Sequence, residues 1–146
     1  MPYFFEDRVV DMGHRRNTAT SRKIQPTELL VSRAIAKARL QEQIQKGMSL
    51  RETRVGSYEQ FIEFRKMHYN WTSSNIDLLL GIFTTDDMAN EYSSVSRFDS
   101  NRTIVPTLTE QSRDLVLYID ALIHQIESII EYVEIVSISS NAVSAD

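Results

Sequence analysis

Three histidines, His14, His68 and His124, are the side chains of this 146-residue sequence best suited to proton transfer or metal binding. Metal-binding helices place two histidines one turn apart or pair a histidine with a carboxylate in a recognised ligand pattern, and none of the three histidines belongs to such a pattern. The chain has no cysteine, which excludes a disulfide, a cysteine nucleophile and a thiolate metal site. We therefore expect no metal ion and no cofactor, and we assign no catalytic residue.

Acidic residues and glycines do not supply a catalytic motif either. The sequence has no phosphate-binding glycine loop and no Gly-x-Ser-x-Gly turn. Glu59 and Glu63 share one face of a predicted helix, and Glu127, Glu131 and Glu134 share another. A di-metal centre needs histidines or further carboxylates on facing helices. We interpret these acids as solvated surface and the chain as non-enzymatic.

Arg8 and His14, separated by "VVDMG", give one enzymatic alternative. This separation resembles the Arg–His motif of the small all-helical HEPN ribonucleases, and the resemblance implies RNA cleavage that depends on these two residues. The family carries its motif on a helix within the bundle, whereas residues 1–25 of this chain are predicted to be irregular. A HEPN-like ribonuclease is therefore the third hypothesis for function.

The run "FIEFRKMHYNWTSSNIDLLLGIF", residues 61–83, predicts a helix that packs lengthwise against another helix. Seven inward positions follow at steps of three and four, and two of them are polar. The positions are Phe61, Phe64, His68, Trp71, Asn75, Leu78 and Ile82. A buried polar group costs roughly 1–3 kcal/mol unless it is hydrogen-bonded. We expect His68 and Asn75 to be hydrogen-bonded interior residues that set register together with Trp71, and a ligand site is the alternative.

A second seam follows Thr107 and predicts another long helix. Its positions are Leu115, Ile119, Leu122, Ile126, Ile129, Val133 and Val136. Val116, Ile123 and Ile130 widen the apolar face, which favours a bundle over a two-stranded coil. Because β-branched residues are moderate helix formers, a strand at "VEIVSIS" is an alternative. We expect the two seams to pack along one another, within one chain or between chains.

Local signals place the helix ends. The first helix is predicted from Pro26 to Lys46 with Gly47 as its stop, and Ala34 and Ala38 would allow close approach of another helix. Capping boxes start the second helix at Ser57 with Gln60, and the last at Thr107 with Glu110. A short helix in "TTDDMANEYSS" is predicted to be capped by Thr84.

The predicted fold class is all-α: a helical bundle of three main helices plus one short helix, with an irregular N-terminal arm. Residues 1–25 form the basic arm, residues 26–138 the bundle domain, and residues 139–146 a flexible tail. The composition, 42% hydrophobic and 25% charged, is that of a globular domain with a real core. Residues 1–40 hold eight Lys or Arg against four Asp or Glu. This asymmetry makes a nucleic-acid-binding accessory subunit the second hypothesis, with contacts from Arg15, Arg16, Arg22 and Lys23.

We expect a cytoplasmic location. The N-terminus lacks a basic start followed by a long apolar run, so it is not a secretory signal. The most apolar stretch, residues 115–138, is interrupted by charged residues and does not predict a membrane span.

Four stretches in order carry a family resemblance: "RAIAKARLQEQIQKGMSLR", "YEQFIEFRKMHYNW", "LLLGIFTTDD" and "EYSS". They resemble the helical modules that precede TIR-like or nuclease domains in bacterial antiviral effectors. Size and fold class are also similar to the small helical subunits of CRISPR effector complexes. The resemblance implies an interaction or oligomerisation module in an antiviral assembly, with a protein partner or a homo-oligomer. It fits either a stand-alone subunit or a fragment of a longer effector.

Overall fold

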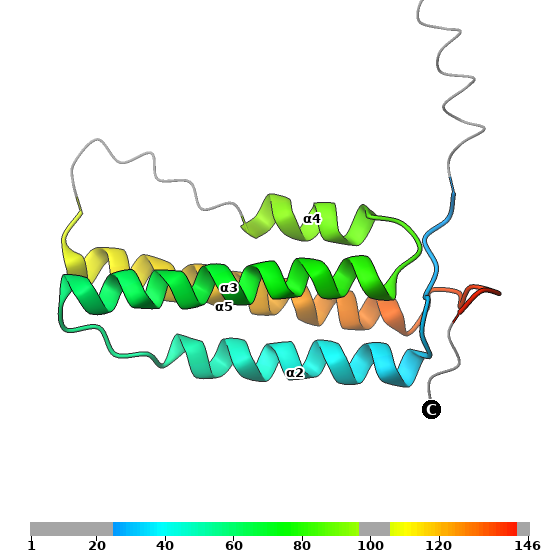
Figure 1. Ribbon diagram of the computed structural model, residues 1–146, viewed down its shortest axis with the longest axis horizontal. Coiled ribbons are helices and arrows are strands. Elements are labelled where there is room, and N and C mark those ends of the chain that lie inside the picture. The colour runs from blue at the N-terminus through cyan, green and yellow to red at the C-terminus, as the bar shows by residue number, and fades with distance from the viewer. Residues whose placement is uncertain (1–24, 97–105, 143–146) are drawn as a thin grey trace, which may run out of the picture.

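The computed structural model describes residues 25–96 and 106–142, and in these residues the chain is all-α, as predicted. Three helices are long, α2 (Arg33–Arg51), α3 (Tyr58–Ile82) and α5 (Leu108–Val133), and α4 (Asp87–Ser96) is short. Figure 1 shows an elongated bundle in which consecutive helices run in opposite directions. No helix in the described part of the chain has the length and apolarity that a bilayer span requires.

Both predicted ends of the first helix are wrong. Helix α2 begins at Arg33 rather than at Pro26, and the Ser32 hydroxyl caps it by accepting a hydrogen bond from the Ile35 N–H at 3.2 Å. The residues before Ser32 are extended because their backbone groups pair with distant parts of the chain. At the other end α2 continues through Gly47, which is buried inside the helix and does not stop it.

Gly47 allows α2 to pack closely against Trp71 of α3. A Cβ atom built on Gly47 would lie 2.5 Å from Trp71 Cζ2 and 3.1 Å from Ile123 Cγ1. Only a residue without a side chain fits at this distance, since real Cβ contacts are longer. Ala34 and Ala38, which the sequence suggested for close approach, are both exposed.

Helices α3 and α5 start where their capping residues predict. Ser57 Oγ accepts a hydrogen bond from the Gln60 N–H at 3.1 Å, and the Gln60 side chain accepts one from the Gly56 N–H at 2.6 Å. The capping box predicted at α3 is therefore incomplete, because the Gln60 side chain bonds Gly56 rather than Ser57, whereas at α5 the capping box is complete. Thr107 Oγ1 accepts from the Glu110 N–H at 3.1 Å, and Glu110 Oε1 accepts from the Thr107 N–H at 2.9 Å. These bonds fix the helix starts because the first N–H groups of a helix have no partner within it.

The predicted short helix is observed as α4, but Thr84 does not cap it. The Thr84 N–H donates to the Glu28 carbonyl at 2.8 Å, and Thr84 Oγ1 accepts from the Glu28 N–H at 2.8 Å. Phe83 beside it is buried, and its ring centroid lies 6.0 Å from that of Tyr132 on α5. The turn between α3 and α4 is therefore held by the segment before α2 and by α5.

Helix α5 contributes the widest apolar face of the bundle and contacts each of the other three described helices. Its buried residues are Leu115, Ile119, Leu122, Ile123, Ile126, Ile129 and Val133, and Val136 is buried just beyond the helix. The α3 and α5 seams meet within one chain, yet α5 packs most extensively against α2. The predicted pairing of two seams is therefore incomplete, because α2 shares the α5 face.

Three extended segments close one end of the bundle, at the right of Figure 1. Residues 28–30 lie between residues 82–84 and residues 137–139, and we call this arrangement the end clasp. Its bridges are isolated pairs rather than a sheet, and α5 remains helical to Val133. The strand considered for "VEIVSIS" is therefore wrong for the described residues, apart from one bridge at Ile138.

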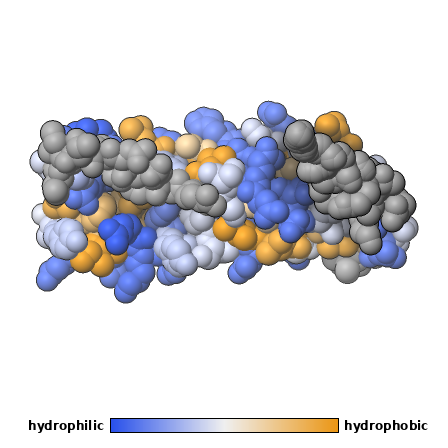
Figure 2. Space-filling view, turned by 90° about the horizontal axis from the view of Figure 1, so that it is seen from above, coloured by the Kyte–Doolittle hydropathy of each residue, from blue (hydrophilic) through white to orange (hydrophobic). Residues whose placement is uncertain are grey.

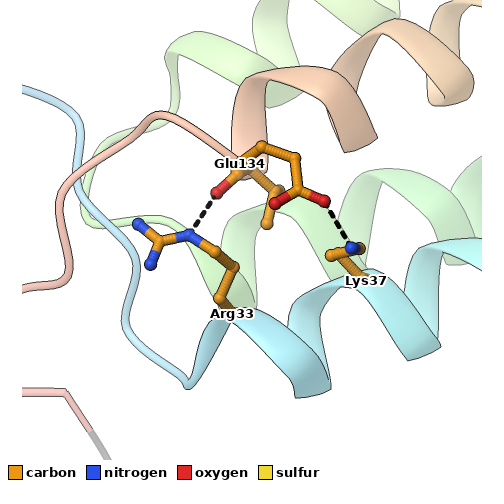
Figure 3. Close-up of polar contacts among 4 residues, drawn as sticks. Arg33, Lys37 and Glu134 are labelled. Atoms are coloured by element: carbon orange, nitrogen blue, oxygen red, sulfur yellow. Dashed lines mark hydrogen bonds and ion pairs between the residues drawn. The ribbon is translucent and has the colours of Figure 1, made fainter.

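Polar contacts also attach α2 to the C-terminal end of α5 (Figure 3). Arg33 Nε donates to the Val133 carbonyl at 2.8 Å, and Arg33 Nη2 donates to the Val136 carbonyl. Lys37, one turn further along α2, forms an ion pair with Glu134. The last carbonyls of a helix have no partner within it and carry partial negative charge, so basic side chains stabilise this end.

Candidate functional site: the two faces of helix α3

The inward face of α3 is part of the core of a single chain. Six seam residues predicted from the sequence are buried there: Phe61, Phe64, His68, Trp71, Asn75 and Ile82. Leu78 is only half-buried, and Leu79 is buried in its place. A helix with 3.6 residues per turn drifts away from a strict seven-residue repeat, so the buried face moves by about one residue along α3. The seam therefore supplies the packing between the helices of one chain.

Trp71 joins α3 to α2. Its indole Nε1–H donates to the Gln43 carbonyl at 3.0 Å, and its ring packs on Gly47. A buried tryptophan usually satisfies its single donor in this way. Trp71 is thus a core anchor with its polar atom used.

The polar seam residues His68 and Asn75 belong to a cluster of polar side chains from three helices, α3, α4 and α5. We call His68, Thr72, Asn75, Tyr92 and Tyr118 the polar cluster. Asn75 Nδ2 on α3 donates to Tyr92 Oη on α4 at 2.7 Å, and His68 Nε2 lies 3.4 Å from Thr72 Oγ1. The rings of His68 and Tyr118, from α3 and α5, have centroids 5.3 Å apart. The cluster links the short helix α4 to the two long helices beneath it.

Burial keeps this cluster uncharged. Desolvation lowers the pKa of His68 to about 4, and it raises the pKa of Tyr92 to about 12. Both groups are therefore neutral near pH 7, whereas a general acid or base works best with a pKa near the working pH. Asn75 Oδ1 is buried and has no hydrogen-bond partner in the described part of the chain. The cluster can hold helices together and lacks a group poised to transfer a proton at neutral pH.

Other sequence-predicted positions are not brought to this site. His124 is exposed on α5, where its Nδ1 lies 2.9 Å from the Asp120 carbonyl. Among the described residues, no three His, Asp or Glu side chains are grouped as metal ligands. The candidate nucleic-acid contacts and the ribonuclease motif lie outside the described residues; they are Arg8, His14, Arg15, Arg16, Arg22 and Lys23.

The outward face of α3 carries large apolar side chains that remain largely exposed beside the core. Tyr58, Ile62, Tyr69 and Leu80 are 60, 42, 69 and 48% exposed, and Ile76 among them is half-buried and packs against the edge of the core. Steps of four, seven, seven and four residues place these five on one side of the helix. We call them the α3 row. In the view from above, hydrophobic surface lies in separate patches along the molecule, with hydrophilic side chains between them (Figure 2).

Comparison of the chain with protein-family models, with curated proteins and with solved structures finds no match. Its function is therefore inferred from the residues described above.

Sequence reasoning missed the α3 row. The signal was present, because apolar residues at helical spacing remained on α3 after the seam was assigned. Sequence reasoning also did not predict the roles of Tyr92, Gly47 and Leu29, which are buried by contacts between elements far apart in the chain.

Proposed function

We propose that this chain is a non-enzymatic helical interaction module that binds a protein through the outward face of α3. The α3 row carries the proposal, because Tyr58 and Tyr69 are more than half exposed while the core is packed without them. Water contact with apolar surface costs about 25 cal/mol per Å², so a row of such side chains favours a covered state.

The residue types of this face support a protein partner. Tyrosine and arginine, with tryptophan, are enriched among the residues that dominate binding energy at interfaces. Arg65 lies between Ile62 and Tyr69 on α3, and its guanidinium sits over the Phe61 ring at 5.9 Å from the centroid. Arg65 is therefore partly oriented before any partner arrives, which reduces the entropy lost on binding.

The proposed setting is an accessory subunit of a multi-protein assembly in bacterial antiviral defence, within the cytoplasm. The four stretches that resemble helical modules of antiviral effectors support it. The neutral, buried polar cluster agrees with a structural role for the seam rather than a catalytic one.

Site-specific photo-crosslinking in the native cells tests this function. A benzophenone side chain placed at Tyr69 is expected to form a protein adduct, because position 69 lies at the middle of the α3 row. The matched control is Leu117, a 59% exposed apolar residue on α5. Adducts at 69 and none at 117 support the proposal. No adduct at 69, or equal adducts at both positions, contradicts it.

A further inference from the structure

We propose that the protein bound by the α3 row is a second copy of this chain, docked antiparallel about a two-fold axis beside Tyr69. This inference rests on the proposed function and names the occupant of the same face.

The α3 row is symmetric about its central residue. Tyr58 and Leu80 lie eleven residues to either side of Tyr69, and Ile62 and Ile76 lie seven to either side. In an antiparallel pair, Tyr58 therefore meets Leu80 of the second copy, Ile62 meets Ile76, and Tyr69 meets its own counterpart. A two-fold interface requires this reciprocity, since residue i contacts j while j contacts i. A partner of unrelated sequence imposes no symmetry on the row.

The charges beside the row favour the antiparallel arrangement over a parallel one. The N-terminal half of α3 has four exposed charged residues, and by helical spacing Arg65 and Lys66 lie nearer the α3 row than Glu59 and Glu63 do. The acidic helix α4, with exposed Asp87 and Glu91 and no Lys or Arg, lies along the C-terminal half (Figure 1). A two-fold axis beside Tyr69 exchanges the halves, so α4 of the second copy comes toward Arg65 and Lys66. A parallel pair would instead bring each basic residue toward its own counterpart.

The length of the row limits how tight the pair can be. The row runs over twenty-two steps of 1.5 Å from Tyr58 to Leu80, about 33 Å, and a helix is about 10–12 Å wide, so each copy buries about 400 Å². The total of about 800 Å² is below the roughly 1,200–2,000 Å² typical of stable complexes. We therefore expect a reversible dimer with a dissociation constant of roughly 1 µM to 1 mM.

Cysteine crosslinking tests the geometry directly, because the chain has no cysteine of its own. Under mild oxidation Tyr69→Cys should form a covalent dimer. Tyr58→Cys and Leu80→Cys should each remain monomeric alone and should form a dimer when mixed. Self-crosslinking of Tyr58→Cys would indicate parallel pairing and overturn the proposal.

Light scattering across protein concentration tests the association without crosslinking. The unmodified chain should show a monomer–dimer transition, and Tyr69→Lys should weaken association at least about tenfold by placing two ammonium groups at the axis. Tyr69 is 69% exposed, so this variant should keep its helical circular dichroism. Leu117→Lys, at a 59% exposed position on α5, is the matched control and should dimerise like the unmodified chain.

A chain that stays monomeric up to about 1 mM, with no crosslink at position 69, overturns the second-copy proposal. If benzophenone at Tyr69 then captures a different protein, the interaction function survives without the dimer. If it captures nothing, both proposals fail.

Discussion

His68 makes the stability of the fold depend on pH. Its pKa falls from 6.5 to about 4 on burial, so the unfolded chain binds a proton more readily than the folded chain between these values. The free energy of unfolding should therefore decrease as pH falls from about 6.5 toward about 4, by up to about 3 kcal/mol. Well above pH 6.5 the imidazole is neutral in both states and has no such effect. Urea denaturation at a series of pH values measures this dependence.

A pair of variants isolates His68 from the carboxylates, which also titrate in this range. His68→Gln removes the buried imidazole and should reduce the loss of stability between pH 6.5 and 4.5. His124→Gln changes an exposed histidine and should leave that loss as in the unmodified chain. An unchanged pH dependence in His68→Gln would assign the effect to other groups.

Gly47 should be intolerant of even one added carbon. Gly47→Ala places a Cβ 2.5 Å from Trp71 Cζ2, and the indole cannot move freely because it is buried and hydrogen-bonded. We expect a loss of about 1–3 kcal/mol, typical of an overpacked core. Gly81→Ala is the control, since nothing lies within 4 Å of its added Cβ in α3. It should stabilise the chain by up to about 1 kcal/mol, because alanine favours helix over glycine. Thermal unfolding of both variants should show opposite shifts.

At the scale of the helix, local capping residues in the sequence predicted where two of the helices begin. The starts of α3 and α5 follow from Ser57 and Thr107, because an N-cap hydrogen bond needs only residues three apart, although the complete capping box forms only at α5. The start of α2 could not be predicted from local signals in this way. Pro26 and its neighbours suit a first helical turn, but Leu29 pairs with residues more than fifty positions away and holds the segment extended. Tertiary hydrogen bonds override local preference here.

The difference between local signals and tertiary contacts also explains how much of the candidate site could be predicted from the sequence. The periodicity of α3 was enough to place His68 and Asn75 inside. It could not supply Tyr92 as the partner of Asn75, because that contact depends on how α4 folds back. Exposed apolar residues are common on protein surfaces. The α3 row could therefore be recognised as a candidate interface only once the structure showed which residues form the core.

At the scale of the whole molecule, the chain closes on itself at one end. Leu29 is fully buried between Phe83 and Ile138, which join the α3–α4 turn to the segment after α5. The opening residues of the described chain are therefore part of the same folded unit as its closing residues. Helix α4 stays attached through two separate contacts, the turn at the end clasp and the bond between Tyr92 and Asn75.

Hydrogen exchange should show that the end clasp opens only with the bundle. The Leu29 N–H donates to the Ser137 carbonyl and the Ser139 N–H donates to the Leu29 carbonyl, both at 2.8 Å. These two amides should exchange about as slowly as those of the core of α5, because Leu29 is buried. The Ile138 N–H, which has no partner in the described part of the chain, is an internal control and should exchange rapidly. Ser139→Pro removes one donor and should speed exchange at Leu29. Equal exchange at Leu29 and Ile138 in the unmodified chain would mean that the clasp opens independently of the helices.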